Sequence, residues 1–444
     1  MRPRSKSGNR TFKTDRIEAT IEELAPGGAG VAITSFGGER RAIFVRHVAV
    51  GDRVALDVDF SRRPAPGRVL ELVSRGPDRV DAPCPHTARC GGCDWMHVSP
   101  AGQRTAHEAH VLRALPEAWR TIAVAWHAAP KRIGARGRAR LHVRASGGRA
   151  IVGMNEVGTN EPVEVDACIV LEPALDRGRG LLGPLLEGAH GRGDAQIALG
   201  TGGLPVLELR WSGALPAEFF GRMERAIAAK EWAGARVLQG EAKKHASIGD
   251  PTPWMRGADD APLMLAPGGF AQASEETNAI LAKRVAALAA ETGAQRIVEL
   301  YSGAGNLSVM LASSDRELVS VESDRGAVDA ARANLTLRHL PGRVVEADAS
   351  VFPIPPPTQL LVLDPPRTGA RAVAEALLKR PVRHVIYVSC DPQTLGRDLA
   401  ILAGARYFPR AIELFEMFPN TSHVETVIAL ERNPPTRPPA GQDS

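Results

Sequence analysis

From about Pro267 to residue 432, the chain alternates between short apolar segments and longer segments with helical periodicity. The apolar segments end in polar or Gly-rich turns: RIVELYSGAG, ELVSVESD, RVVEADAS, QLLVLDPP and HVIYVSCD. Helix-like segments accompany them, such as SEETNAILAKRVAALAAE, for which Ser274 is a suitable N-cap. Strands that alternate with helices predict βαβ units, and therefore a parallel sheet with helices on both faces.

The preceding part of the chain has a different pattern of apolar and Gly-rich segments. Short apolar runs between Gly-rich turns over residues 15–75 predict a small β-barrel. A helix is expected at QRTAHEAHVLRAL, and alternating Gly-rich stretches over 137–215 predict a mixed sheet with loops at LRWSGALP and GEAKKHASIGD. The predicted domains are a disordered basic tail (1–14), a barrel (15–78), a central domain (79–265), an α/β domain (266–432) and a disordered tail (433–444).

Composition and cysteine usage exclude some classes of protein. The first 16 residues are basic and polar, and no run reaches the roughly 18 apolar residues that span a bilayer. We therefore expect a cytoplasmic protein without a membrane partner. Five cysteines are an odd and small number for a disulfide scaffold of 444 residues, so metal binding or catalysis is favoured.

The formal net charge of +5 is mostly local. Residues 1–16 carry six Lys/Arg against one acid, so the rest of the chain sums to zero. Residues 118–155 contain no acid and eight cations: Arg120, Lys131, Arg132, Arg136, Arg138, Arg140, Arg144 and Arg149. Such a run favours a polyanionic partner over a merely solvated face.

A cofactor site is predicted where the first α/β strand ends in Gly303-x-Gly305. The glycines allow backbone to approach a ligand closely. Acids stand at the ends of three later strands: Glu322, Asp348 and Asp364. Ligands of open α/β sheets bind at these ends, and Glu322 could take ribose hydroxyls. The third glycine of a dinucleotide site is absent, which favours S-adenosylmethionine over NAD.

Two further residues are candidates for covalent chemistry. Cys390 leaves an apolar strand and enters the polar turn of VSCDPQTL, where a thiolate could act as a nucleophile. A buried cysteine acting as a small hydrophobe is the alternative. Glu425, two residues after His423 in FPNTSHVET, could be a general base or a surface residue.

These motifs resemble a known family. GGFAQ (268–272), YSGAGN, VESD, LDPPRTGA, VSCDPQTLGRDL and MFPNTSHVE resemble, in order and spacing, the RNA uracil-5-methyltransferases over residues 15 to about 432. The resemblance implies that Cys390 adds to C6 of a uridine and that Glu425 removes the C5 proton. It also implies a set of S-adenosylmethionine contacts: Gln272, Tyr301, Asn306, Glu322, Asp348 and Asp364.

The same resemblance also implies a role for the other four cysteines. Cysteines spaced by five and then two residues, with a distant fourth, ligate a [4Fe–4S] cluster in the branch acting on 23S ribosomal RNA. The matching residues are Cys84, Cys90, Cys93 and Cys168. Spacing alone leaves a zinc site with four cysteine ligands as an equal alternative, and the resemblance favours the cluster. The segment GVAITSFGGERRAIFVRHVAVGD resembles a TRAM domain, an RNA-binding barrel of the oligonucleotide-binding type.

The expected fold class is therefore multi-domain: a TRAM-like barrel, a central α+β iron–sulfur domain and a Rossmann-like α/β methyltransferase domain. The expected function is methylation of uridine C5 in 23S ribosomal RNA by a monomer that binds RNA. The same chemistry on the T-loop uridine of transfer RNA is one alternative, and a non-catalytic iron–sulfur RNA-binding protein is another.

The sequence departs from the family pattern at three positions. Asp391 stands where the family usually has Asn, Asn420 where it usually has His, and Ser302 where it often has Cys. A second carboxylate beside the nucleophile is expected to raise the thiol pKa.

Overall fold

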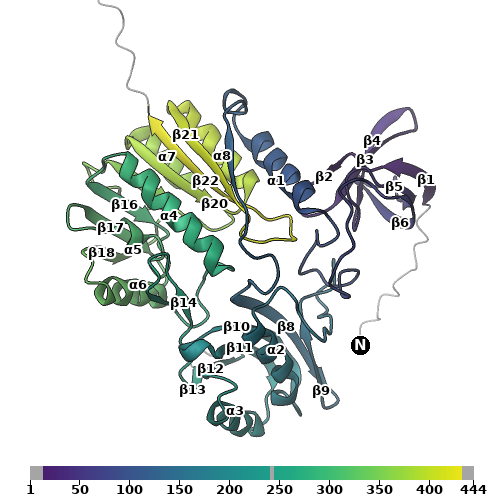
Figure 1. The fold of residues 1–444 in the computed structure, drawn as a ribbon, viewed down its shortest axis with the longest axis horizontal. Coiled ribbons are helices and arrows are strands. Elements are labelled where there is room, and N and C mark those ends of the chain that lie inside the picture. Colours follow the sequence, from purple (N-terminus) through teal and green to yellow (C-terminus); the bar gives the residue numbers. More distant parts are fainter. Residues whose placement is uncertain (1–13, 241–244, 433–444) are drawn as a thin grey trace, which may run out of the picture. The chain divides into compact units, whose positions relative to one another are not determined.

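The computed structural model describes residues 14–240 and 245–432. The predicted tails therefore lie outside the described residues, except for Thr14. The described chain forms two compact units. The first contains residues 14–88, 93–107 and 420–422, and the second contains 89–92, 108–240, 245–419 and 423–432 (Figure 1). Among the described residues, no helix combines the length and the apolar character that crossing a membrane requires.

The first unit is built on a six-stranded sheet with the order β1-β5-β6-β4-β3-β2. Its strands are β1 (Asp15–Thr20), β2 (Glu23–Leu24), β3 (Gly30–Phe36), β4 (Glu39–Val45), β5 (Arg53–Val58) and β6 (Ala65–Ser74). Gly37 and Gly38, both with positive φ, form the two-residue turn between β3 and β4. Side chains such as Ile43, Val45 and Leu56 are fully buried in its core. The predicted small β domain is thus a six-stranded sheet.

Helix α1 (Pro100–Ala114) confirms the helix expected near residue 103. The 3₁₀ turn η1 (Glu117–Trp119) and strand β7 (Val124–His127) follow it. β7 lies within the residues that the sequence assigns to the central domain, yet it pairs with β21 (Tyr407–Phe415) at the edge of the α/β sheet.

A second six-stranded sheet has the order β13-β12-β11-β10-β8-β9. Its strands are β8 (Arg138–Ser146), β9 (Arg149–Gly153), β10 (His190–Leu199), β11 (Pro205–Ala214), β12 (Gly234–Gln239) and β13 (His245–Gly249). Only β11 and β12 run parallel, so the predicted mixed sheet is confirmed. The loop predicted at LRWSGALP is wrong, because residues 209–214 belong to β11 and Trp211 is buried in the core.

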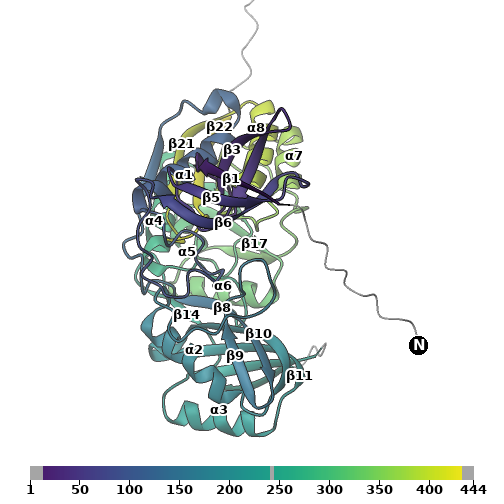
Figure 2. The same ribbon diagram turned by 90° about the vertical axis from the view of Figure 1, so that its right-hand side faces the viewer.

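Alternation of side chains gives this central sheet two different faces. Odd-numbered residues such as Leu141, Ile197 and Leu207 are buried against α2 (Pro173–Leu185) and α3 (Glu218–Ala228) (Figure 2). Even-numbered residues lie on the opposite face, since neighbouring residues of a strand point to opposite sides. The 3₁₀ turn η2 (Thr201–Gly203) and the hairpin of β14 (Trp254–Arg256) and β15 (Pro262–Met264) complete this region.

The α/β sheet has eight strands in the order β18-β17-β16-β19-β20-β22-β21-β7. Its other strands are β16 (Arg296–Leu300), β17 (Glu317–Glu322), β18 (Arg343–Glu346), β19 (Leu360–Leu363), β20 (His384–Ser389) and β22 (Glu425–Arg432). Strands β16 to β20 are parallel, and β22 is antiparallel to its neighbours. The helices are α4 (Glu275–Glu291), α5 (Ser308–Leu311), α6 (Arg325–Leu337), α7 (Arg371–Lys379) and α8 (Pro392–Gly404).

Helices cover both faces of this sheet, as predicted (Figure 1). Leu360 and Val362 of β19 pack into one core together with α4 and α6. Leu361 and Leu363 of the same strand pack into a second core with α7 and α8. A strand that is apolar at every position is the signature of a sheet buried on both sides. Ser274 caps α4 by accepting the N–H of Thr277 (3.3 Å), which confirms the predicted N-cap.

Candidate active site

The register of two neighbouring strands places Cys390 beside Glu425. Ser389, the last residue of β20, pairs with Thr426 of β22. The next residue along β20 is Cys390, and the preceding residue along β22 is Glu425. Because these strands are antiparallel, both residues lie at the same edge of the sheet, where the parallel strands end.

We call the site formed by Cys390, Glu425 and Asp364 the catalytic corner. Burial raises the pKa of all three groups. Burial, together with the carboxyls of Glu425 and Asp364, raises the pKa of the Cys390 thiol to about 12, whereas the Arg367 guanidinium lowers it. Burial and Asp364 raise the pKa of Glu425 to about 8, and Arg367 again opposes the shift. Burial raises the pKa of Asp364 to about 7. Perturbed pKa values gathered in one corner are typical of functional sites.

Asp391 has a structural role beside the thiol. Its Oδ1 accepts the N–H groups of Gln393 (3.0 Å) and Thr394 (2.8 Å), so it is the N-cap of α8. Asn and Asp serve equally well at an N-cap, which explains why this departure from the family pattern is tolerated.

Asn420 also has a backbone role. Its φ is 66°, a left-handed conformation that Asn adopts more readily than most residues. Within the first unit, its N–H donates to Gln103 Oε1 (3.0 Å) and its carbonyl accepts the N–H of Trp95 (3.0 Å). The N–H and hydroxyl of Ser422 donate to the Asp94 carboxylate, at 2.9 and 2.6 Å. The backbone of this turn is therefore fixed by hydrogen bonds.

Glu322 fixes the Gly-rich turn after β16 through hydrogen bonds to the backbone. Glu322 Oε2 accepts the N–H of Gly303 (3.0 Å), and Oε1 accepts the N–H groups of residues 323 and 324. Gly303 has φ 53° and faces open space on its Cβ side. Tyr301 also has positive φ (63°), which is strained for an aromatic residue and is characteristic of functional sites. The turn leads into a helix as predicted, although α5 is short and begins only at Ser308.

The other candidate cofactor residues differ in how far their side chains are engaged. Gln272 is buried, and its Oε1 has no hydrogen-bond partner among the described residues. The Asn306 amide exchanges two hydrogen bonds with Asn278 (2.8 and 2.9 Å). Asp348 is exposed, and its Oδ1 accepts the N–H and hydroxyl of Ser350. Gln272 is thus the best placed of these to accept a hydrogen bond from a ligand.

Glu299 supports the same turn and was missed in the sequence. It is almost fully buried in β16, and its Oε2 accepts the hydroxyls of Ser308 (2.5 Å) and Ser320 (2.9 Å). Burial raises its pKa to about 7. A lone acid inside an apolar strand was the only available signal.

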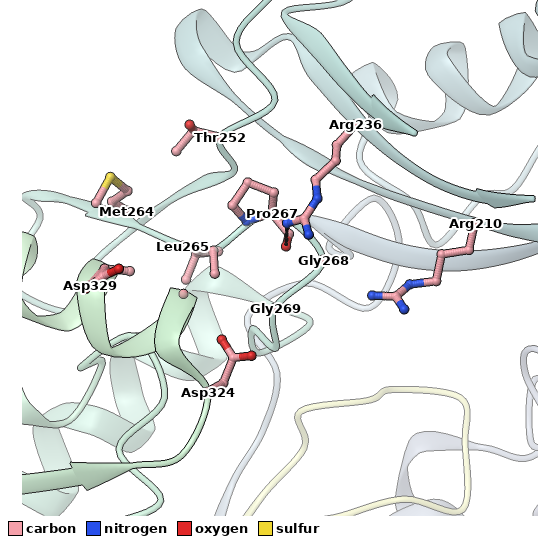
Figure 3. A pocket seen from close by; sticks show the side chains of 13 residues that line it. Arg210, Arg236, Thr252, Met264, Leu265, Pro267, Gly268, Gly269, Asp324 and Asp329 are labelled. Carbon is pink, nitrogen blue, oxygen red and sulfur yellow. Dashed lines mark hydrogen bonds between the residues drawn. The ribbon is translucent and has the colours of Figure 1, made fainter. Parts of the chain in front are cut away.

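A cavity of about 370 Å³ lies between the central sheet and the first turns of α6, and neither Cys390 nor Glu425 lines it. Arg210 and Arg236 of the central sheet lie on one side, and Asp324 and Asp329 lie on the other (Figure 3). The loop of residues 264–269 forms part of its wall. Because the catalytic candidates are absent from its lining, we do not assign the target base to it.

The loop before Gln272 is anchored on the central sheet. Arg236 Nη1 donates to the carbonyl of Pro267 (3.1 Å). Gly268 has φ 72° and lies directly on the Glu208 carboxylate, where an added Cβ would come within 2.2 Å of both oxygens. Only glycine fits this close approach. Phe270 follows with 70% of its surface exposed, and the Arg138 guanidinium lies 6.0 Å from its ring centroid.

The open face of the central sheet carries arginines from four neighbouring strands. The cross-strand pairs Arg140–Gln196, Gln196–Glu208 and Glu208–Arg236 define one row across it. The arginines on this face are Arg138, Arg140, Arg144, Arg192, Arg210 and Arg236. We call this set, together with Phe270, the arginine face.

The basic stretch at 118–155 is not without counter-charges, contrary to the sequence analysis. Acids distant in sequence pair with half of its cations. These pairs are Lys131–Glu276, Arg132–Glu416, Arg144–Glu161 and Arg149–Glu164. No ion pair is found for Arg138 or Arg140 within the described ranges. Of the basic stretch, these two therefore remain candidates to bind the predicted polyanionic partner.

The four cysteines predicted as cluster ligands are half-buried. Cys84 and Cys93 belong to the first unit, and Cys90 and Cys168 belong to the second. Burial raises the pKa of the Cys168 thiol. In residues 14–240 and 245–432, no three His, Cys, Asp or Glu side chains are grouped so that they could hold a metal ion.

Comparison with solved structures identifies the fold. The crystal structure of Pyrococcus abyssi tRNA (uracil-54, C5)-methyltransferase in complex with S-adenosyl-L-homocysteine matches this chain with a TM-score of 0.73. The match covers 93% of this chain and 100% of that one, at 20% sequence identity. The chain therefore shares the multi-sheet fold of that protein, including its α/β domain.

Comparison of sequences identifies the family. A family model described as tRNA (Uracil-5-)-methyltransferase matches residues 357–433, and one described as Methyltransferase small domain matches 264–385. Two proteins named 23S rRNA (uracil(1939)-C(5))-methyltransferase RlmD are similar over most of their length. The one from Chromohalobacter salexigens is 31% identical (98% of this chain, 94% of that protein), and the one from Halomonas elongata is 33% identical (94% and 89%). The chain belongs to the family of RNA uracil-5-methyltransferases.

Proposed function

We propose that this protein transfers a methyl group from S-adenosylmethionine to C5 of a uridine in 23S ribosomal RNA. The observation that carries the proposal is the pairing of β20 with β22, which sets the half-buried thiol of Cys390 beside the buried carboxyl of Glu425. A family member needs these two groups for the reaction, one as nucleophile and one as base. The choice of 23S ribosomal RNA rests on the names of the relatives.

The chemistry follows from the electronic structure of uracil, whose C5 is a poor nucleophile. Addition of the Cys390 thiolate to C6 moves the C5=C6 electrons into an enolate at O4. C5 then takes the methyl group, and the donor sulfur keeps the electron pair of the broken bond. In its ionised form, Glu425 removes the C5 proton, and the electrons of that C–H bond restore C5=C6 and expel the thiolate.

The cofactor contacts are proposed from the residues around the Gly-rich turn. When bound, S-adenosylmethionine supplies an electrophilic methyl group on a sulfonium. The unpartnered Gln272 Oε1, the open space beside Gly303 and the Glu322 carboxylate at a strand end fit a polar ligand there. Tyr301, Asn306, Asp348 and Asp364 complete the proposed set. Asn306 has less free capacity than the others, because Asn278 already engages its amide.

RNA binding is proposed for the barrel-like first sheet and for the arginine face. A base that reacts at C6 must be turned out of its helix. Exposed aromatic rings stack on such unpaired bases, and guanidinium groups bind phosphates. Phe270 and Arg138 offer both chemistries next to Gln272. We keep the predicted domain limits of 15–78, 79–265 and 266–432 as part of this proposal, except that β7 extends the α/β sheet.

A [4Fe–4S] cluster on Cys84, Cys90, Cys93 and Cys168 remains part of the proposal. The spacing of these cysteines and the family support it, and a structural zinc site is the alternative. Within the second unit, Cys90 forms an isolated backbone bridge with Glu156. Any cluster would be structural here, and no step above uses it.

The experiment that tests the proposal is a map of 5-methyluridine in ribosomal and transfer RNA from cells with and without this protein. Cells that carry only Cys390→Ala serve as the control for protein presence. Loss of one 23S site in both deletion and C390A cells is expected. Loss of the transfer-RNA mark instead would overturn the substrate, and an unchanged map would favour a non-catalytic RNA-binding protein.

A further inference from the structure

Asp398 of α8 is a fully buried carboxylate that lies outside the set of residues used so far. Its Oδ2 accepts the N–H of Ala370 (2.7 Å) and the hydroxyl of Tyr387 (2.7 Å). Its Oδ1 accepts Nε of Arg397 (2.8 Å). A buried carboxylate with three donors is well satisfied, and its loss would leave those donors unpaired. The bonds to Ala370 and Tyr387 join α8 to the turn after β19 and to β20.

Two further side chains of α8 hold the same turn. Arg397 Nη2 donates to the carbonyl of Thr368 (2.8 Å), and the Thr394 hydroxyl donates to the carbonyl of Arg367 (3.0 Å). Gly369, with φ 75°, packs so tightly on α8 that an added Cβ would lie 2.6 Å from the polar atoms of residues 397 and 398. Side chains of α8 therefore bind three backbone groups of this turn: the carbonyls of Arg367 and Thr368 and the N–H of Ala370.

We propose that Asp398 is a positioning residue, which fastens this turn to α8 and thereby keeps the Arg367 guanidinium among the groups around the Cys390 thiol. The helix α8 begins two residues after Cys390. We call the hydrogen bonds between α8 and residues 367–370 the clamp. The clamp thus joins the segment that carries Cys390 to the segment that carries Arg367. The role in catalysis rests on the proposed function, whereas the role at the thiol does not.

The groups around the thiol show why this cation matters. Glu425 from β22 and Asp364 from the end of β19 disfavour the thiolate, and Arg367 is the cation that favours it. His423 lies 3.4 Å from Arg367 (Nη2 to Nε2). Near Asp398 itself the charged and titratable groups are Arg397, Tyr387 and Tyr301. A shift of Arg367 would leave two carboxyls facing the thiol without a compensating charge.

The test measures the reactivity of Cys390 directly in the full-length protein. Iodoacetamide alkylates thiolates, and peptide mass spectrometry gives the rate at Cys390 between pH 7.5 and 9.5. In this range the thiolate is the minor form, so the rate is proportional to its fraction. We expect Asp398→Asn to lower the rate about three- to tenfold at each pH, which corresponds to a pKa rise of about half a unit to one unit.

A matched pair of tyrosines separates this role from stability alone. Tyr387 and Tyr407 are both fully buried, and each hydroxyl binds a loop. Tyr387→Phe removes a contact to Asp398, whereas Tyr407→Phe removes the contacts to Val382 at the other end of the sheet. Both should lower the melting temperature, but only Tyr387→Phe should slow alkylation. Thr394→Val provides a second variant of the clamp if Asp398→Asn fails to fold.

Arg367→Met completes a double-mutant cycle. If Asp398 acts through Arg367, the double variant D398N/R367M should alkylate no more slowly than R367M alone. Fully additive effects, an unchanged or faster rate in D398N, or an equal effect of Y407F would overturn the proposal. A covalent adduct with 5-fluorouridine RNA, measured on the same samples, reports the proposed function separately. Its absence from the unmodified protein would refute that function, while the alkylation rates would still decide the role of Asp398.

Discussion

The catalytic corner and the cysteine motif were both implied by one family resemblance, but the structure places them differently. Cys390 and Glu425 lie on hydrogen-bonded neighbouring strands, so the backbone ladder itself brings them together. The four motif cysteines lie outside the helices and strands, and only Cys90 has an isolated bridge, to Glu156. No ladder fixes the positions of their thiols.

This difference shows what backbone structure can position without a ligand. The register between β20 and β22 is set by the antiparallel ladder, in which six consecutive residues of β20, His384 to Ser389, pair with residues of β22. The active-site pair therefore forms whether or not substrate is present. A set of thiols from irregular segments has no comparable constraint, and a metal that joins them contributes folding energy itself.

The largest effects are expected at the catalytic corner. Cys390→Ala should abolish both methylation and the adduct with 5-fluorouridine RNA. Glu425→Gln should slow turnover by about 10²- to 10⁴-fold, because the C5 proton can no longer be removed. It should also accumulate a covalent complex with ordinary uridine RNA, visible on a denaturing gel when cofactor is present. Equal adduct levels in E425Q and C390A would contradict the assigned roles.

Substitutions in the cysteine motif should lower iron content and stability but leave the Cys390 adduct intact, in contrast to substitutions at the catalytic corner. Cys168→Ser should reduce the bound iron from roughly four atoms per chain to near zero, with loss of broad visible absorbance. The melting temperature should fall, whereas the protein that remains folded should still form the Cys390 adduct. Iron analysis, absorbance and calorimetry measure this. Zinc instead of iron in the purified protein would refute the cluster, and loss of the adduct at unchanged stability would make the motif part of the chemistry.

Much of the α/β fold could be predicted from local pattern. The strands before Tyr301, Asp364 and Cys390, the Ser274 cap and the position of Glu322 at a strand end all follow from periodicity and from turn chemistry. These features depend on residues close together in the sequence. Cys390 and Glu425 were predicted through the family resemblance, and the pairing of β20 with β22 that brings them together joins residues far apart in the sequence.

The features that could not be predicted depend on long-range contacts. The acids that neutralise Arg132 and Lys131 lie far along the chain, at Glu416 and Glu276. In the sequence, Asp398 looks like an ordinary solvent-facing acid of a helix, next to Arg397. Only the fold shows that its carboxylate accepts the N–H of Ala370. The segment LRWSGALP looks like a loop because of its Gly and Pro, although strand pairing buries Trp211. Tertiary pairing overrides local propensity in each case.

A smaller effect is expected at the arginine face. Phe270→Ala should weaken binding of single-stranded or loop RNA by about 1–3 kcal/mol, with the dependence on salt unchanged, since stacking is not ionic. Arg138→Ala should instead reduce the slope of log affinity against log salt by about one. Filter binding over a salt series measures both. Phe408→Ala is the matched control, because this ring is also exposed but lies on β21. Equal losses for F408A and F270A would remove Phe270 from the RNA site.

The smallest effect concerns stability rather than rate. Burial raises the pKa of Glu425 to about 8, so the folded state keeps a proton on it that the unfolded state loses near pH 4.5. The unfolded state therefore binds fewer protons between these values, and stability falls as pH rises, by at most about 1.4 kcal/mol per pH unit. Glu425→Gln cannot ionise and should escape this loss. Its melting temperature should match that of the unmodified protein near pH 5 and exceed it by a few degrees at pH 8. The exposed Glu71→Gln serves as the control, and parallel melting curves for E425Q and the unmodified protein across this range would show that the carboxyl is not held protonated in the folded site.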